Sequence, residues 1–295
     1  MRLRPPVWDD AQAVLAVLVA RHTTDVGLPL FRLEEVLDEW RAPDVTLGDD
    51  AIVVEAEGSI IAYAIVHRPG ALAVVAPAHE GRGAGARLLA WVQQRERERG
   101  SEVHRQIAAS TNARARELLE VAGYRQVRSY WRMARPVERG VDPVDPPAGV
   151  ALRALDPDAD ARALHALDAE TFGPAPDYIP ESLEMFVAEH LRAHDAAPEL
   201  SLVAQDGQAI VGFLLVRRWP HESTGYVELL AVAPGHQRRG IGKALLTHGF
   251  AGFARAGLAQ AQLGVASDNA RGLRLYEAAG MEPRFRFDVF ERPLS

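Results

Sequence analysis

The sequence predicts an α/β protein made of two tandem copies of one domain, each with a mixed, mostly antiparallel central sheet flanked by helices. Three observations support this prediction. The chain has 295 residues, about twice the length of a typical single domain. A stretch of residues recurs at a fixed offset, and strand and helix signals alternate within each copy.

The repeat is clearest where residues 110–114 (STNAR) recur as 267–271 (SDNAR), an offset of 157 residues. The same offset places Gly85 on Gly242. It holds without a gap over about fifty residues, which chance matches rarely do. We therefore infer that a domain of roughly 140 residues has been duplicated.

The boundary between the copies is predicted from proline content. Residues 141–149 contain three prolines in a short acidic stretch, and such a stretch fits neither a helix nor a central strand. We predict an N-terminal domain over 1–140, a Pro-rich linker over 141–149 and a C-terminal domain over 150–295.

The first half of the second copy reads as a strand, two helices and a hairpin. The first strand is expected at 150–155, and the helical segments at 158–171 and 180–194. Two short apolar runs flank Asp206-Gly207, a strong signal for a hairpin turn. The two strands of this hairpin are expected at 200–204 and 210–216.

The second half alternates strand and helix. An apolar strand is expected at 226–233. Residues 240–256 place apolar or small residues every four positions before Gly257, which predicts a helix and its end. Asp268 or Asn269 is a typical helix cap. The remaining elements are a strand at 261–266, a helix that ends at Gly280 and a strand at 285–290.

Composition excludes several classes of function. Hydrophobic residues make up 48% and charged residues 25%, ordinary values for a soluble globular chain. The sequence has no cysteine, which removes disulfides, thiolate metal sites and cysteine nucleophiles. A net charge of −7 makes nucleic acid or an anionic membrane a poor partner. Because no apolar run of 18 residues and no signal-peptide pattern is present, we expect a cytoplasmic protein.

A glycine-rich basic loop, residues 237–243 (QRRGIGK), lies between the strand at 226–233 and the helix at 240–256. A helix start offers unpaired N–H groups and a positive dipole end, and glycines let the backbone approach a ligand closely. The loop is neither a Rossmann G-x-G-x-x-G nor a P-loop. It therefore favours a pyrophosphate site over an ordinary basic turn.

These residues resemble the GNAT (GCN5-related) N-acetyltransferase family, whose loop motif Q/R-x-x-G-x-G/A matches residues 237–242 fully. Asn269, Tyr276, Gly280 and Met281 resemble a second feature of that family, which follows the next strand. The resemblance covers about 150–292 and, more loosely, about 3–135. The tandem arrangement, with the better motif in the second copy, resembles the mycothiol synthase type.

The resemblance implies transfer of an acetyl group from acetyl-CoA to a primary amine of a small molecule by direct attack in a ternary complex, without a metal. The resemblance also implies which residues contact CoA. They lie in the strand, in the glycine loop and at the start of the later helix: Leu230, Ala231, Val232, Gln237, Arg238, Arg239, Gly240, Ile241, Gly242, Lys243 and Asn269.

Two side chains are candidates for proton transfer. Glu228 is the one acidic residue in 226–233, and a carboxylate there could take the proton of the amine. Tyr276 could protonate the departing thiolate, the role that the family implies for it. The alternatives are a solvated strand glutamate, a core aromatic and, for Asn269, a plain helix cap.

The first copy lacks these groups. At the offset of 157, Glu228 falls on Ala71, Tyr276 on Leu119 and Gln237 on Glu80. A carboxylate beside a pyrophosphate is repulsive, so the first copy reads as a scaffold that has kept the fold.

The acceptor is predicted only by charge. Residues 156–199 contain eleven acids and two arginines, so an acidic lining would attract a cationic amine, although a solvated helical surface fits the same composition. His190 and His194 have a spacing typical of metal ligands, but without a third ligand a solvated helix face is the better interpretation. A non-catalytic acyl-CoA sensor or interaction module, a protein N-terminus or lysine as acceptor, and a monomer or a homodimer all remain open.

Overall fold

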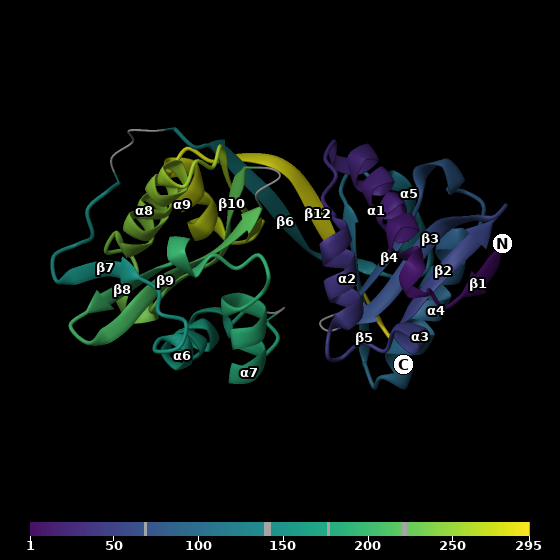
Figure 1. Cartoon of the computed structure of the whole chain (residues 1–295), viewed down its shortest axis with the longest axis horizontal. Coiled ribbons are helices and arrows are strands. Elements are labelled where there is room, and N and C mark those ends of the chain that lie inside the picture. The colour runs from purple at the N-terminus through teal and green to yellow at the C-terminus, as the bar shows by residue number, and fades with distance from the viewer. Residues whose placement is uncertain (68–69, 139–142, 176–177, 220–222, 295) are drawn as a thin grey trace. The chain divides into compact units, whose positions relative to one another are not determined.

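The computed structural model describes residues 1–67, 70–138, 143–175, 178–219 and 223–294 (Figure 1). The chain forms two compact units. Unit 1 contains residues 1–130 together with the chain from residue 285 on, and unit 2 contains residues 131–284. Each unit has strands packed against helices, so the predicted α/β class is confirmed.

Unit 1 contains an antiparallel sheet in the order β1-β2-β3-β4. Its strands are β1 (Arg2–Arg4), β2 (Ala51–Ala56), β3 (Ser59–His67), β4 (Gly70–Val75) and β5 (Val103–Ala109). Its helices are α1 (Ala11–Val26), α2 (Leu33–Arg41), α3 (Leu47–Asp50), α4 (Ala84–Glu98) and α5 (Ala113–Val121). The remaining strand, β5, pairs antiparallel with residues 287–293.

Unit 2 follows the predicted element order. Its strands are β7 (Val150–Ala154), β8 (Leu202–Asp206), β9 (Ala209–Trp219), β10 (Thr224–Val232) and β11 (Gln260–Ala266). Its helices are α6 (Ala161–Phe172), α7 (Leu183–Phe186), α8 (Ile241–Arg255) and α9 (Ala270–Ala278). Strands β7 to β10 pair antiparallel in sequence order, whereas β10 and β11 run parallel, which makes the sheet mixed.

Two long strands belong to both units. Residues 131–136 of β6 (Arg125–Pro136) fall in unit 2, and residues 285–293 of β12 (Glu282–Pro293) fall in unit 1. The compact units are therefore cut at 130/131 and 284/285, not at the predicted 140 and 150. The predicted domain boundaries follow the sequence repeat, whereas the compact units follow packing. The boundaries of the duplicated domains therefore stay a prediction. Residues 141 and 142 of the predicted linker lie outside the described residues.

The repeat is confirmed element by element. Helix α8 begins and ends 157 residues after α4, and β11, α9 and β12 stand at the same offset from β5, α5 and β6. The shared glycines of the two loops, Gly83 and Gly240, both adopt positive φ values of 83° and 94° at the start of the helix. The duplication therefore preserved the backbone of the loop as well as the secondary structure.

One predicted helix is wrong in part. The segment 180–194 forms a short α-helix, α7, capped by the Ser182 side chain, and continues as a π-helix at Val187–Leu191. Single π-turns of this kind occur often at functional sites. Phe186 and Leu191 are buried in the core beside β9, which fixes the orientation of this segment. Among the described residues no helix is both long and apolar enough to cross a bilayer.

Candidate active site

Strand β10 separates from β11 halfway along its length. The parallel pairing runs from Thr224 opposite Gln260 to Val227 opposite Leu263 and then stops. On the other edge, β10 continues to pair with β9 as far as Val232. The edge of Leu230 and Ala231 that faces β11 therefore has no ladder partner among the described residues. Such an edge can accept an extended, amide-bearing ligand as an added strand.

The separation coincides with a β-bulge. The register between β10 and β9 shifts after Val227, which pairs with Val216, and before Leu229, which pairs with Leu215. Glu228 is the extra residue between these two pairs. A bulge re-aims the side chain of its extra residue, so the backbone irregularity and the candidate base occur at the same position.

The Glu228 carboxylate is largely buried, with its side chain 11% exposed. Its Oε1 accepts hydrogen bonds from His190 Nδ1 at 2.8 Å and from Arg217 Nη2 at 2.5 Å. Its Oε2 is buried and has no hydrogen-bond partner among the described residues. Glu228 is therefore not a solvated strand residue. One oxygen is held by two donors, and the other can accept a proton.

His190 was predicted on a solvated helix face, and that prediction is wrong. Its side chain is 16% exposed and packs against the ring of Phe186, with the ring centroids 5.0 Å apart. The contact with Glu228 joins segments 38 residues apart, which no local spacing could predict. A signal was nevertheless present, because His190 lies four residues after a core phenylalanine and therefore on the same helical face.

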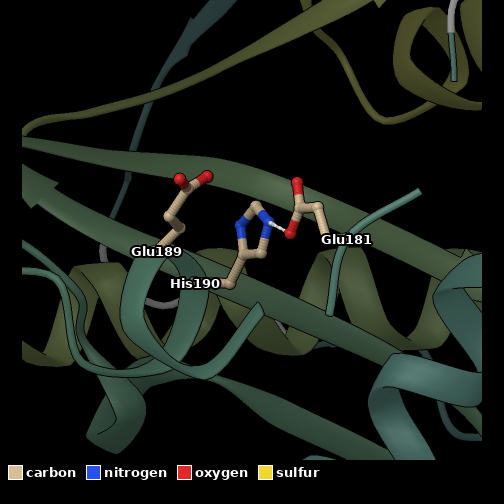
Figure 2. A group of neighbouring side chains, drawn as sticks. All are labelled: Glu181, Glu189 and His190. Carbon is tan, nitrogen blue, oxygen red and sulfur yellow. Dashed lines mark ion pairs between the residues drawn. The ribbon is translucent and has the colours of Figure 1, made fainter. Parts of the chain in front are cut away.

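Figure 2 shows the His190 ring between the side chains of Glu181 and Glu189. One ligand atom from each of these residues lies within 4.8 Å of the others, a spacing that could hold a cation. His190 Nε2 is 3.3 Å from Glu181 Oε2, and Nδ1 faces Glu228. Both ring nitrogens thus already face carboxylates. We interpret the group as an ion-paired imidazolium cluster, and the prediction that no metal is needed stays a prediction.

The protonation of His190 follows from these contacts. Burial is the largest influence and lowers the pKa of His190, but the hydrogen bond and charge of Glu228 and the charge of Glu181 raise it. The net result is a raised pKa. The cationic form of His190 is therefore stabilised beside Glu228.

Arg217 holds the other side of the Glu228 carboxylate. Its Nη1 donates to Asp195 at 2.6 Å, and Asp195 also accepts from Trp219 Nε1 at 3.1 Å. Arg217 Nη2 donates to the Glu189 carbonyl at 2.8 Å and so ties β9 to the π-helix. These fixed partners give Glu228 a defined orientation.

Part of segment 156–199 places carboxylates near His190, and the acidic lining of an acceptor site stays a prediction. Asp168 on α6 is buried, accepts a hydrogen bond from Tyr178 at 3.2 Å and has a raised pKa because of its burial. Together with Glu181 and Glu189 it belongs to the surroundings of His190. Asp160, in contrast, pairs with Arg153 at 2.6 Å and stabilises the fold.

Tyr276 lies on α9 and is 9% exposed, within the core beside α8. It is therefore a core aromatic, as one alternative proposed, and this packing does not exclude a role for its hydroxyl. Burial raises the pKa of Tyr276 to about 12. The phenol thus keeps its proton at neutral pH, the state that a general acid needs.

The glycine loop has the geometry of an anion site. Gly240 has a φ of 94° and caps α8, and Arg238 has a φ of 64°, a conformation that non-glycine residues rarely adopt. Gly242 packs close to Leu275 and Val232. Arg238, Arg239 and Lys243 are exposed, and Arg239 also pairs with Asp206 at 3.4 Å. These features fit the diphosphate of a CoA molecule.

Three further predicted residues have structural contacts in or near the loop. Gln237 donates from Nε2 to the Val232 carbonyl at 3.0 Å and accepts from Arg271, so its side chain connects the loop to β10. Asn269 caps α9 by accepting a hydrogen bond from the Gly272 N–H at 2.9 Å. Ile241 is fully buried and anchors the first turn of α8. Gln237 and Ile241 thus act on the loop from within the protein.

The family model described as "Acetyltransferase (GNAT) family" matches residues 22–124 and 161–281. This chain belongs to that family, and it is an N-acetyltransferase with two GNAT domains. Both copies are matched, in agreement with the repeat.

Curated relatives and solved structures agree with this assignment. A mycothiol acetyltransferase from Geodermatophilus obscurus is 30% identical, over 91% of this chain and 89% of its own. One from Streptomyces avermitilis is 33% identical, over 73% of this chain and 68% of its own. A GCN5-related N-acetyltransferase from Sphaerobacter thermophilus is similar with a TM-score of 0.86 at 28% identity, covering 99% of this chain and 95% of that one. A tandem GNAT protein from the clavulanic acid biosynthesis pathway shares the fold, with a TM-score of 0.77 at 14% identity, over 100% of this chain and 98% of its own.

Proposed function

We propose that unit 2 transfers an acetyl group from acetyl-CoA to a primary amine, with Glu228 as general base and Tyr276 as general acid. The observation that carries the proposal is the Glu228 carboxylate at the β10 bulge, with Oε1 held by two donors and Oε2 buried without a hydrogen-bond partner among the described residues. A base needs a fixed orientation and a free lone pair, and this side chain has both.

The chemistry assigns one proton to each residue. Glu228 Oε2 takes a proton from the ammonium group, directly or through a water, and the neutral amine nitrogen attacks the thioester carbonyl. The C–N bond forms, the nitrogen gives its second proton to solvent water, and the C–S bond breaks. The Tyr276 hydroxyl gives its proton to the departing thiolate, and its pKa of about 12 keeps that proton available until the thiolate forms.

The separated half of β10 and the glycine loop would hold the acetyl-CoA. Backbone groups of Leu230 and Ala231 can pair with the amide-bearing arm, and a backbone N–H there can polarise the carbonyl. The exposed cations Arg238, Arg239 and Lys243 can neutralise the diphosphate at the start of α8.

The acceptor is proposed from charge and from relatives. The carboxylates of Asp168, Glu181 and Glu189 around His190 favour a cationic amine. Because relatives that cover most of the chain are named mycothiol acetyltransferases, the first small molecule to test is the mycothiol precursor that lacks its acetyl group. A protein N-terminus or a lysine is the competing acceptor.

The test is an acceptor panel incubated with acetyl-CoA, with products identified by mass spectrometry. The panel contains the mycothiol precursor, amino sugars, polyamines and peptides with a free N-terminus or lysine. Acetylation of one small amine, lost in Glu228→Gln, supports the proposal. Acetylation of peptides alone would reject the acceptor class, and full activity in Glu228→Gln would reject the base.

A further inference from the structure

Each copy of the repeat contributes the end of its last strand to the unit built mainly from the other copy. We call these pieces, residues 131–136 of β6 and 285–293 of β12, the exchanged segments. Met133, from the first copy, is fully buried in the core of unit 2. Its equivalent at the offset of 157, Phe290, is fully buried in the core of unit 1. Unit 2 therefore contains a strand segment of the copy that lacks the candidate proton-transfer groups.

An arginine on each exchanged segment binds the end of a helix. Arg135 Nη1 donates to the Ala279 carbonyl at 2.5 Å, at the C-terminal end of α9. The equivalent Arg292 Nη1 donates to the Ala122 carbonyl at 2.7 Å, at the C-terminal end of α5. The last carbonyls of a helix have no partners within the helix and carry the negative end of its dipole. A guanidinium therefore stabilises both helix ends.

Gly280 makes room for Arg135. The residue has a φ of 79°, which favours glycine, and a Cβ there would lie 3.4 Å from Arg135 Nη1. In unit 1, Gly123 has a φ of 82°, and a Cβ there would lie 4.0 Å from Arg292 Nε. The catalytic steps above give Gly280 no role. Its contact with Arg135 therefore accounts for a motif residue that those steps leave unused.

In unit 2 the guanidinium also contacts α8. Arg135 Cζ lies 5.1 Å from the centroid of the Phe250 ring, and Phe250 is buried. A guanidinium over an aromatic face is attracted to it. Unit 1 has Gln93 at the position of Phe250, and Gln93 donates to the Tyr124 hydroxyl instead. Arg135 thus joins the end of α9 to α8, a connection that its equivalent does not make.

Helix α9 carries the candidate general acid. Tyr276 lies three residues before Ala279 and belongs to the same core cluster as Met133 and Phe250. A helix of nine residues is not stable by itself, so the position of α9 depends on the contacts at its ends. A small displacement of a reacting group can cost a large factor in rate. The contacts of Arg135 therefore bear on the placement of the Tyr276 hydroxyl.

We propose that Arg135 is a positioning residue for Tyr276. It holds the C-terminal end of α9 against α8 and so keeps the Tyr276 hydroxyl where the departing thiolate forms. The inference rests on the proposed role of Tyr276 as general acid. It gives the first copy of the repeat a part in the reaction of unit 2, although that copy has Leu119 in place of Tyr276.

The test compares Arg135→Met with Arg292→Met in the full chain. Methionine keeps an apolar side chain and removes the donors and the charge. Arg292→Met is the matched control, because it deletes the equivalent contact in the unit that has Leu119. Arg135→Lys is the conservative variant, because it keeps the charge and a donor group.

Stability, kinetics and local protection are measured together. Thermal melts give Tm, and steady-state rates give kcat and the KM for acetyl-CoA with the amine that the acceptor panel shows to react fastest. Hydrogen–deuterium exchange is followed at the Met281 amide, which donates to the Tyr276 carbonyl at 3.0 Å.

Arg135→Met should lower kcat by about three- to tenfold and leave the KM for acetyl-CoA unchanged, because the glycine loop is untouched. Exchange of the Met281 amide should rise by a similar factor. Arg135→Lys should keep most of the activity, and Arg292→Met should lower Tm similarly while leaving kcat unchanged. In Tyr276→Phe, adding Arg135→Met should lower kcat no further, because the group that it positions is gone.

A wild-type kcat in folded Arg135→Met, an equal fall in Arg292→Met, or an additive fall in the double variant would each overturn the inference. If Arg135→Met does not stay folded, the same comparison is made with Arg135→Gln and Arg292→Gln, which keep a side-chain N–H. A wild-type kcat in Tyr276→Phe would reject the general acid of the proposed function and this inference with it. The variant that fails thus shows which of the two proposals is wrong.

Discussion

Units 1 and 2 have equivalent helices and strands over residues 84–136 and 241–293. Asn112 and Asn269 are equivalent and both cap a helix, but Ala71 and Leu119 occupy the positions of Glu228 and Tyr276. Strand β4 pairs with β3 in continuous register through Ala71, whereas β10 has a bulge at Glu228, the equivalent position. The first copy thus lacks both the carboxylate and the backbone irregularity that presents it. Backbone and side chain at this position differ together.

The two loops differ in the same way. Gly81 and Arg238 are equivalent and both have positive φ, 72° and 64°. In unit 1 the position is occupied by the residue that tolerates this conformation, while in unit 2 an arginine adopts it. Arg238 adopts this conformation beside the candidate phosphate site, which makes its charge a candidate for phosphate binding. Conservation of fold therefore does not imply conservation of site.

The largest expected effect distinguishes the two loops directly. Gly242→Glu should abolish acetyl transfer, because the new side chain blocks the approach of the phosphates and adds negative charge beside Arg238 and Lys243. Gly85→Glu should leave most of the activity. The steric change is larger at Gly85, where a Cβ would meet Leu118 at 2.9 Å, than at Gly242, where it would meet Leu275 at 3.4 Å, so loss of activity in Gly242→Glu alone cannot be a packing effect. Steady-state rates are compared once thermal melts show both proteins folded.

If the inactive protein is instead the folded Gly85→Glu variant, the active copy has been assigned wrongly. In that case unit 1 would have to supply the chemistry despite Ala71 and Leu119 at the positions of Glu228 and Tyr276.

The next largest effect concerns the base. Glu228→Gln keeps the shape of the side chain and can still face His190 and Arg217, but it cannot accept a proton. We expect kcat to fall by about 10²–10⁴, the usual value of general base catalysis. The control is a double variant that combines Glu228→Gln with Ala71→Glu. A carboxylate at the equivalent position of unit 1 should not restore activity.

Tyr276→Phe should lower kcat at least tenfold while leaving CoA affinity little changed. The substitution removes one hydroxyl and preserves the ring that packs in the core. A kcat equal to that of the wild type would assign Tyr276 to the core alone. Because the hydroxyl lies outside the glycine loop, an altered CoA affinity would point to a structural effect.

The smallest expected effect is a change in stability with pH through His190. Its pKa is raised in the folded protein, so its contribution is fully present below the unfolded value of about 6.5 and is lost as pH rises through the folded pKa. The wild type should therefore exceed His190→Gln in Tm by about 2–4 °C at pH 5.5, roughly 1 kcal/mol for a chain of this size. The difference should shrink at higher pH, and a constant difference would remove the ion-pair account.

Local signals in the sequence predicted much of the fold. The Asp206-Gly207 turn, the glycine-started helix at 241 and the Asn269 cap each depend on neighbouring residues, and each lies where expected. The π-helix at 187–191 was not predictable, because its geometry follows from packing of Phe186 and Leu191 against the sheet.

The site was predictable only in part for the same reason. Glu228 stood out as the one acid in an apolar strand, but its partners His190 and Arg217 come from segments 38 and 11 residues away. The division of β6 and β12 between the two units, at 130/131 and 284/285, likewise depends on long-range pairing that no local pattern encodes.

The central claim is that the chain has one acetyl-CoA site, in unit 2. Calorimetric titration of CoA into the full chain tests it most directly. One tight site per chain, lost in folded Gly242→Glu and retained in Gly85→Glu, is the predicted result. Two tight sites, or a single site that survives Gly242→Glu, would contradict the account.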